Sequence, residues 1–507
     1  MQAGSLPSQT RREVLLHLGA VAAATSLLSP TAQGAGNQVH GRVLNRQSGA
    51  GLPGVMVSNG RDVVVTGSKG AWTLPASGGD TIFVIKPAQW SYTDAAGMPQ
   101  FSKRVDALAG IEDCTFYLEP RQENAIFEVA LLADTQAANA QELDYVRREI
   151  EAAVTPGAYA FAINHGDLMG DDLRLLGAYR DIVSKTGMLW HHCPGNHDMD
   201  LSSTTGEGAF ATWRREVGPT CYAFQYGEAT FILLNNVEYL GAGAEPLDGR
   251  LYRGRIGADQ LTFVRNVLGH VPHDQLVVVS MHIPLTSFEN PDAPGDNTSD
   301  RAKLMDLLSR FPHTVSFSGH SHTTEHHYLG AEEGFALEHQ HHHHVLTAFC
   351  GSWWGGPLNS KGIPVSDSRD GSPRGFHVLC VDGNRYATRF VPLGDCPDRD
   401  MRIGVDDRPD AAPQKTLLVD VFDGGQKTKI RCSLPGAQGS IELTREAIPD
   451  PHIVESYARH RDLLKPWVSA APSSHIWTAP LPARPPGEIT LHVTNEYGVE
   501  KLLQVEI

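Results

Sequence analysis

Residues 188–198 read MLWHHCPGNHD, a short and mostly apolar run followed by a glycine turn and three polar residues. This pattern predicts a buried strand that ends at the turn. Ligands of open α/β sheets lie beyond the carboxyl ends of the strands, and Gly195 lets the backbone bend so that the following side chains point there. Asn196 offers an amide oxygen to a divalent ion, and the imidazole of His197 can protonate a leaving group near neutral pH.

Four other apolar runs precede polar residues of the same kinds. Residues 138–154 and 175–183, which lie between the first strands, carry apolar side chains at helical spacing. Strands that alternate with helices pair in parallel, so we expect the polar side chains to gather at one edge of a sheet. The runs and the polar residues after them are 127–133 with Asp134 and Gln136, 159–164 with Asp167, 275–281 with His282, and 313–318 with His320 and His322.

The motifs D-x-Q, GD, GNHD, a lone His and GHxH, in this order, resemble those of the calcineurin-like metallophosphoesterase superfamily over roughly residues 125–393. The resemblance implies an α/β (α+β) fold, with a central β-sandwich flanked by helices, and a site that holds two divalent metal ions. It implies that His197 is the general acid. Asp198 is the next residue, and we expect it to hydrogen-bond the imidazole and fix its tautomer. By position, the first metal would be held by Asp134, Gln136, Asp167 and His322, and the second by Asp167, Asn196, His282 and His320, with Asp167 bridging.

The residue types fit this chemistry. Two divalent cations about 3.5–4 Å apart hold the attacking and departing oxygens of a phosphoryl group and supply a metal-bound hydroxide for the attack. The mixed imidazole, amide and carboxylate donors suit Mn, Fe, Zn or Ni better than Ca, and they do not select among these ions. Gln136 stands where the commonest family pattern has His, so it either coordinates the first metal or hydrogen-bonds one of the ligands.

The 507 residues are enough for three domains. Short alternating runs predict an N-terminal β-sandwich over residues 36–121, which resembles the transthyretin-like domains that precede some secreted enzymes. The metallophosphoesterase-like domain occupies residues 122–395. Residues 396–507 contain strand-like runs, interrupted by one helix-like run at 452–464, and predict a C-terminal β-rich accessory domain. This order resembles an exported branch of the superfamily that carries accessory domains at both ends.

Residues 1–35 resemble an export signal of the twin-arginine type. Arg11 and Arg12 precede a mild apolar run over residues 14–28, and residues 32–34 (AQG) form a small-residue cleavage site. The run is too short and too weakly apolar for a membrane span, and no other stretch suits one. We therefore expect a periplasmic or secreted protein without a membrane span in its mature form.

The overall composition excludes one class of partner. With 58 acidic and 42 basic residues the net charge is -16, which argues against nucleic-acid polymers, because their binders carry basic patches. The seven cysteines include no C-x-x-C motif, and their odd and sparse number argues against a disulfide framework. The oligomeric state stays open.

Further patterns concern the mouth of the site. Trp353 and Trp354 lie between glycines and are candidate substrate-binding residues, of which we expect one ring to pack in the core. Residues 339–344 (HQHHHH) are either a metal-collecting tract or a strand. We favour the strand and leave its histidines outside the ligand set, since successive side chains of a strand face opposite sides and so cannot all be ligands. Residues 238–255 and 288–300 are expected to be loops near the site, and the second is a candidate lid.

These expectations converge on a metal-dependent phosphoesterase that hydrolyses a phosphodiester or phosphomonoester of a small or surface-attached molecule. One alternative is a glycan- or surface-binding protein whose phosphoesterase domain is degenerate. The other is a nucleotide or nucleotide-sugar pyrophosphatase, for which the Trp pair would be a platform for the base. Fold alone does not choose the substrate.

Overall fold

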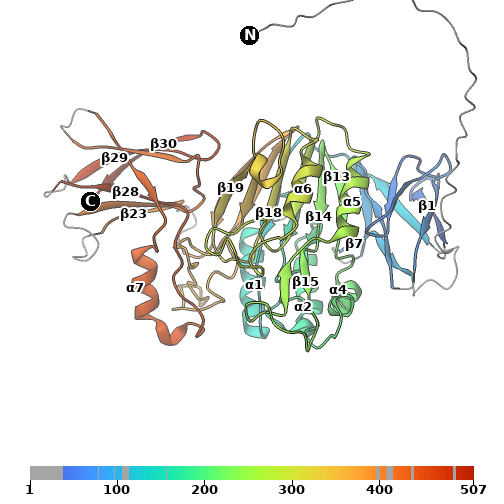
Figure 1. Ribbon diagram of the computed structural model, residues 1–507, viewed down its shortest axis with the longest axis horizontal. Helices are drawn as coiled ribbons and strands as arrows, with labels where there is room; N and C mark the ends of the chain where they lie inside the picture. Colours follow the sequence, from blue (N-terminus) through green and yellow to red (C-terminus); the bar gives the residue numbers. More distant parts are fainter. Residues whose placement is uncertain are drawn as a thin grey trace, which may run out of the picture.

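The computed structural model describes residues 38–77, 79–95, 98–105, 114–155, 157–395, 400–406, 415–435, 439–482 and 487–507. The predicted export signal over residues 1–35 lies outside the described residues, as does Cys396. The six cysteines in the described part are free. The sheets fall into an N-terminal, a central and a C-terminal group, and most of the helices surround the central one (Figure 1).

The central part is built on two sheets, and the predicted parallel pairing is confirmed. The first sheet has the order β12-β11-β10-β21-β22, with β10, β11 and β12 parallel. β10 also pairs antiparallel with β21, which lies far along the chain, so that Ile126 is opposite Asp382. The bounds are β10 (Ile126–Leu132), β11 (Phe161–Asn164), β12 (Trp190–His192), β21 (Gly375–Asp382) and β22 (Arg385–Pro392).

The second central sheet has the order β13-β14-β17-β18-β20-β19. Its four inner strands run parallel, and the edge strands β13 and β19 run antiparallel to their neighbours. Every residue of the inner strands is buried, as expected for parallel strands covered on both faces. The bounds are β13 (Tyr222–Tyr226), β14 (Ala229–Leu233), β17 (Leu276–Ser280), β18 (Thr314–Ser318), β19 (Glu325–Leu329) and β20 (His341–Val345).

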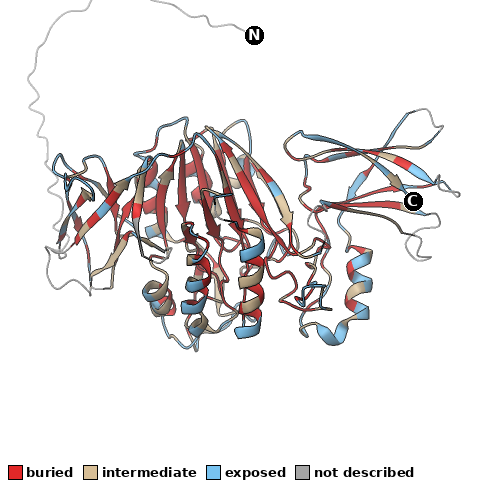
Figure 2. Cartoon of the chain, turned by 180° about the vertical axis from the view of Figure 1, so that it is seen from behind, coloured by how far each residue is buried: buried red, intermediate tan, exposed pale blue. Residues whose placement is uncertain are grey.

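Amphipathic helices flank these sheets, with exposed outer faces over buried strands (Figure 2). α1 buries Leu143, Val146 and Ile150 on one face, and Asn139 caps its start by accepting hydrogen bonds from two backbone N–H groups. Among the described helices, none is both long and apolar enough to cross a membrane. The bounds are α1 (Ala140–Ala153), α2 (Leu176–Ser184), α3 (Gly206–Ala209), α4 (Ala211–Glu216), α5 (Ala258–Leu268) and α6 (Arg301–Leu308).

The N-terminal part is a pair of sheets with the orders β4-β1-β9-β6-β7 and β3-β2-β5-β8. It packs on the second central sheet, since Phe83 lies 5.8 Å from Phe263 of α5 and Phe101 lies 4.9 Å from Tyr222 of β13, measured between ring centroids. The bounds are β1 (Gln38–Asn45), β2 (Met56–Ser58), β3 (Val63–Val65), β4 (Ala71–Pro75), β5 (Thr81–Ile85), β6 (Trp90–Ala95), β7 (Met98–Gln100), β8 (Ser102–Arg104) and β9 (Cys114–Pro120).

The C-terminal part is another pair of sheets, with the orders β23-β24-β28-β27 and β26-β25-β29-β30. Their facing sides bury an apolar core that includes Val419, Trp477 and Leu491. The bounds are β23 (Met401–Asp406), β24 (Thr416–Val421), β25 (Lys429–Ser433), β26 (Ile441–Glu442), β27 (Thr444–Glu446), α7 (Pro451–Arg459), β28 (Ile476–Pro480), β29 (Glu488–Thr494) and β30 (Glu500–Glu506).

The sequence pattern missed elements within the long connections. The expected loop at 238–255 holds a two-stranded ribbon, in which β15 (Val237–Tyr239) pairs with β16 (Tyr252–Gly254). Strands of three residues are too short to show a period of two, which explains the omission. The polar stretch 288–300 is a loop, as expected, and leads directly into α6.

Candidate active site

Polar residues from the predicted strand ends meet beyond the carboxyl ends of the central strands. Nε2 of His282 lies 3.0 Å from Oδ1 of Asn196 and 3.3 Å from Oδ2 of Asp167. Nδ1 of His320 lies 3.2 Å from the same His282 nitrogen. These are the four residues expected around the second metal. Donor atoms bound at about 2.0–2.1 Å to one zinc-type ion lie roughly 3.3 Å apart, so this set fits a divalent cation.

The residues expected around the first metal lie next to this cluster. Nε2 of His322 is 3.6 Å from Oδ1 of Asp134. Gln136 lines the same pocket as Asp167, and its backbone N–H donates to the Asp167 backbone oxygen at 2.9 Å. The amide oxygen of Gln136 lies 3.8 Å from Sγ of Cys350. The first set is therefore gathered more loosely than the second.

The strand ends adopt an unusual backbone conformation. Eight of the eleven non-glycine residues with positive φ in the described chain lie at this site or directly behind it. Each such residue costs about 1–3 kcal/mol and persists where its surroundings fix it, most often at functional sites. Five of the eight are expected metal ligands. The eight are Asp134, Gln136, Asp167, Asp171, His320, His322, Trp353 and Trp354.

Gly195 permits a close approach that the site needs. A Cβ added there would lie 2.1 Å from Oδ1 of Asp167, much closer than van der Waals contact. The same carboxylate oxygen accepts a hydrogen bond from the backbone N–H of His197 at 2.8 Å. The turn after β12 therefore wraps around Asp167 and fixes its side chain.

His197 lines the pocket, and its Nδ1 lies 2.7 Å from Oδ1 of Asp171. Asp198 was expected to hold this imidazole, but in the described structure its carboxylate makes no hydrogen bond with the ring. The buried Asp198 carboxylate instead accepts hydrogen bonds from three backbone N–H groups in the loops after β11 and β12. Asp198 therefore connects the loops after β11 and β12. Asp171, and not Asp198, orients the His197 ring.

Burial and neighbouring charges shift the pKa values of these groups. Burial raises the pKa of the Asp134 carboxyl to about 7, and the nearby Asp167 charge adds to the shift. Asp167 is also buried, but the imidazoles of His282 and His197 outweigh burial and lower its pKa. Burial alone would lower the pKa of the His282 imidazole, but the charges of Asp167 and Asp134 and the hydrogen bonds to the ring together outweigh it and raise the pKa to about 9. Several perturbed groups in one cleft are typical of a chemically active site.

A pocket of about 190 Å³ opens over the cluster. Arg250 pairs with Asp296, whose Oδ1 lies 3.2 Å from Nε2 of His320. Arg369 donates two hydrogen bonds to Glu289, at 2.9 and 2.7 Å. The lining residues that were not among the predicted site residues are Arg250, Tyr252, Ser287, Glu289, Asn290, Asp296, Ser321 and Arg369.

Some of these residues left a signal in the sequence. The expected loop at 238–255 is rich in Arg and Tyr and supplies Arg250 and Tyr252. The polar loop at 288–300 follows His282 and supplies Glu289 and Asp296. Arg369 and Cys350 had no comparable signal, because each reaches the site through the folding of the long segment between β20 and β21.

The two tryptophans differ in what they contact. The ring of Trp353 stacks on the imidazole of His322, with 4.1 Å between centroids, and lines the pocket. Trp354 is buried, its Nε1–H donates to the backbone oxygen of Thr135, and its ring lies 5.8 Å from that of Tyr145. Trp354 therefore packs behind the site, which corrects its assignment as a substrate-binding residue and leaves Trp353 as the candidate.

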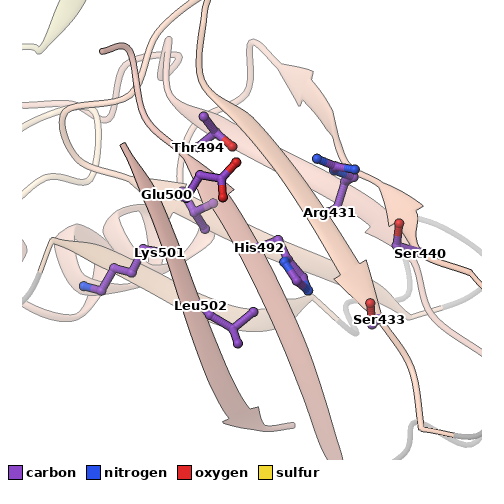
Figure 3. Close-up of a pocket in the computed structure, with 9 residues that line it drawn as sticks. Arg431, Ser433, Ser440, His492, Thr494, Glu500, Lys501 and Leu502 are labelled. Atoms are coloured by element: carbon purple, nitrogen blue, oxygen red, sulfur yellow. The ribbon is translucent and has the colours of Figure 1, made fainter. Parts of the chain in front are cut away.

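A second hollow of about 470 Å³ lies on the sheet formed by β25, β29 and β30 (Figure 3). Its polar side chains include Arg431, His492, Glu500 and Lys501, which spread along the three strands instead of converging on one point. All of the described residues that line it belong to the C-terminal part. None of the expected metal ligands is among the described residues that line this hollow.

Carboxylates, imidazoles and an amide gathered at the strand ends of a two-sheet α/β core define a metallohydrolase. The family model described as calcineurin-like phosphoesterase matches residues 127–324. Models described as the N-terminal and C-terminal parts of calcineurin-like phosphoesterase match residues 37–121 and 343–500. The chain belongs to the calcineurin-like phosphoesterases, which are hydrolases of phosphoric esters that use divalent metal ions.

Two solved structures show weak similarity. Purple acid phosphatase PPD1 from yellow lupin (Lupinus luteus) seeds is 12% identical, with a TM-score of 0.36 over 73% of this chain. The match spans 66% of the lupin chain, just under two thirds of its length. A metallophosphoesterase from Sphaerobacter thermophilus is 13% identical, with a TM-score of 0.25 over 54% of this chain and 90% of its own. No curated protein matches the chain.

Proposed function

We propose that the protein is an exported phosphoesterase that binds two divalent ions from among Mn, Fe, Zn and Ni and hydrolyses a phosphodiester or phosphomonoester. One observation carries the proposal: donor atoms from four separate strand ends meet around Nε2 of His282. Asp134, Gln136 and His322 would complete the other metal site, with Asp167 shared between the two. The twin-arginine-like residues at the start of the sequence support export to the periplasm or beyond.

When bound, the two ions would activate a water molecule and neutralise charge on the phosphoryl oxygens. The protein fixes which nitrogen each imidazole presents to them. His282 and His322 each direct Nδ1 at a backbone oxygen, at 2.8 and 2.6 Å, so Nε2 faces the cluster. His320 is turned the other way: its Nε2 lies 3.2 Å from Oδ1 of Asp296, and its Nδ1 faces the cluster.

His197 would donate the proton that the departing oxygen requires. The residue follows the expected ligand Asn196, lines the pocket and is held through Nδ1 by Asp171. The other ring nitrogen is then free to face the leaving group. Asp198 would contribute indirectly, by fixing the turn that carries His197.

The pocket supports a small or surface-attached phosphoester as the substrate. Arg250 and Arg369 bring positive charge to the mouth, although each is already paired with a carboxylate. Trp353 adds one aromatic face beside the metal ligands. A nucleotide or nucleotide-sugar pyrophosphatase is the second candidate. Stacking of a base on Trp353 would support it, although only one of the two tryptophans lines the pocket.

The test is metal analysis of the purified protein combined with a panel of phosphodiesters and phosphomonoesters. Asp167→Asn should weaken both metal sites, because the charge that they share disappears, and should reduce turnover to near background. The matched control is Asp181→Asn, since Asp181 is an exposed residue of α2. The control should retain both metal and rate.

The same panel separates the alternatives. A folded Asp167→Asn variant with full metal content and full rate would contradict the two-metal assignment. Bound metal without turnover of any phosphoester would support the glycan- or surface-binding alternative. Preferential turnover of nucleotide diphosphate linkages would support the pyrophosphatase.

A further inference from the structure

Three histidines converge on one carboxylate at the junction of the central and C-terminal parts. Their Nε2 atoms lie 3.2, 3.2 and 3.1 Å from Oδ1 of Asp423, and they belong to His326, His344 and His377. The histidines come from β19, β20 and β21, and Asp423 lies just after β24. β19 is the edge strand that faces the C-terminal sheets (Figure 1). The cluster is thus distinct from the residues that line the active-site pocket.

Hydrogen bonding alone does not satisfy this cluster. One carboxylate oxygen offers about two lone pairs, whereas three ring nitrogens approach Oδ1 of Asp423. Within the described residues, neither ring nitrogen of His344 or His377 makes a hydrogen bond of acceptable geometry, although both side chains are fully buried. Buried polar atoms are nearly always paired in native proteins, so imidazoles aimed at one point in this way indicate a ligand.

The packing and hydrogen bonds of the imidazoles suit the binding of a cation. The rings of His326 and His344 stack 4.0 Å apart, which disfavours a positive charge on both. Nδ1 of His326 lies 2.9 Å from Nε2 of His342, whose Nδ1 lies 3.0 Å from the Tyr386 hydroxyl. With Nδ1 of His326 as the donor in this series, the lone pair of its Nε2 faces Asp423 and is available to an ion.

We propose that His326, His344, His377 and Asp423 bind a divalent zinc-type ion that joins the C-terminal part to the central sheets. Donors held at about 2.0–2.1 Å by a tetrahedral zinc lie roughly 3.3 Å apart, close to the separations from Oδ1. The donor atoms of His326, His344 and Asp423 all lie within 4.8 Å of one another, and His377 approaches from the other central sheet. Four protein ligands close the coordination sphere, which is typical of structural sites.

The turn that carries Asp423 is shaped to reach the histidines. A Cβ at Gly425 would lie 2.6 Å from Cβ of His326, so only glycine allows this approach. The backbone N–H groups of Lys427 and Thr428 donate to Glu496, at 2.9 and 2.8 Å, and hold the turn in place. The Asp423 side chain is 17% exposed, which gives an ion a route from solvent.

The experiment measures zinc bound per chain in the wild-type protein and in Asp423→Asn after equilibration with zinc. We expect the variant to bind one equivalent less, because it loses a charged ligand at a partly exposed position. Its turnover of phosphoesters should stay within about twofold of wild type, since the two sites share no residue. The control is His339→Gln, which removes an exposed histidine of the same tract and should bind as much zinc as wild type.

A second measurement covers the case in which a variant fails to fold. Anomalous scattering at the zinc edge from wild-type crystals should place a peak among the four side chains. Equal zinc content in wild type and folded Asp423→Asn, or zinc-loaded crystals without that peak, would overturn the site. Zinc should also raise the thermal midpoint of wild type more than that of Asp423→Asn, and an equal shift in both would contradict the joining role.

Discussion

At the scale of single residues, the leaving group determines how strongly the rate of hydrolysis depends on His197. An alkoxide needs a proton as it departs, whereas a nitrophenolate scarcely does. His197→Ala should keep its metals and lose roughly 10²–10⁴-fold in rate on alkyl phosphoesters, with a much smaller loss on nitrophenyl esters. Steady-state rates on the two ester classes, together with metal analysis, check this expectation. Equal losses on both would indicate that the ring positions the phosphoryl group instead.

Asp171 should act through His197 and not on its own. Its Oδ1 lies 2.7 Å from Nδ1 of the ring. Asp171→Asn should therefore slow alkyl ester hydrolysis less than His197→Ala does, and the double variant should be no slower than His197→Ala alone. A double-mutant cycle on one alkyl ester measures this coupling. Additive losses would give Asp171 an independent role.

The Gln136 position tests the looser of the two metal sites. Imidazole is a better donor than an amide oxygen for zinc-type ions, so Gln136→His should bind the first metal more tightly and shift its preference towards zinc. Competition titrations between Mn and Zn provide the measurement. Unchanged affinity and preference would mean that Gln136 hydrogen-bonds a ligand instead of coordinating the ion.

At the scale of elements, the segment after β20 places two similar rings in different environments. Trp354→Ala should lower the free energy of unfolding by about 3–5 kcal/mol, because it removes a buried ring. Trp353→Ala should cost much less stability. It should instead raise KM for substrates with a planar group, since stacking on a base is worth about 1–3 kcal/mol in other proteins. Chemical denaturation and KM values for planar and minimal esters check the pair, and similar unfolding losses in both would make Trp353 a core residue as well.

The strand ends could be predicted because buried parallel strands are contiguous apolar runs that stop at a glycine or polar residue. Asp167 and His282 were found in this way, and the structure brings them within 3.3 Å of each other. The hydrogen-bond partner of the His197 ring could not be predicted from the same pattern. Asp171 and Asp198 are both acidic and both follow a strand, and the choice between them depends on a left-handed backbone at Asp171, with φ of 71°.

The histidine tract shows the same limit over a longer distance. Alternation along β20 correctly predicts that His341 and His343 face one side of the strand and His342 and His344 the other, where they meet different partners. The carboxylate that meets His344 belongs to the turn after β24, in the C-terminal part. A local period describes one strand at a time, so it carries no information about Asp423.

At the scale of the whole molecule, a buried ion pair joins the N-terminal sheets to the central part. Nζ of Lys86 lies 2.7 Å from Oε1 of Glu123, and Oε2 accepts hydrogen bonds from the backbone N–H groups of Gln89 and Gly227, both at 2.9 Å. Lys86→Met leaves the Glu123 charge buried without its partner. This change should lower the free energy of unfolding by about 3–5 kcal/mol.

Denaturant titration of Lys86→Met beside Lys69→Met measures this effect, because Lys69 is an exposed lysine of the same part. The control should unfold as wild type does. A loss that is equally small in both variants would show that the N-terminal sheets do not depend on the buried pair.

A second buried charge cluster makes the junction with the C-terminal part sensitive to pH. His475 is buried between Asp420 and Asp370, and these carboxylates outweigh burial and raise its pKa to about 10. Arg402 also faces Asp420, at 3.6 Å. Because the folded pKa lies above the unfolded value of about 6.5, the contribution of His475 is complete below that pH and is lost as pH rises towards 10. Unfolding free energies between pH 6.5 and 10 should fall less steeply in His475→Gln, and parallel slopes would contradict this.

The pairing of β10 with β21 leaves one edge of β10 unpaired in the nascent chain during synthesis. Ribosomes add about 5–20 residues per second, so the strand that completes the Ile126–Asp382 register emerges roughly 13–50 s after β10 itself. During that interval β10, the middle strand of the first central sheet, has an unpaired edge, which is a template for contacts with other chains. Every expected metal ligand precedes β21 in the sequence, yet the layer that carries Asp134 closes only when β21 arrives. The sheet that positions Asp134 is therefore complete only late in synthesis, and the free edge of β10 is open to contacts with other chains until then.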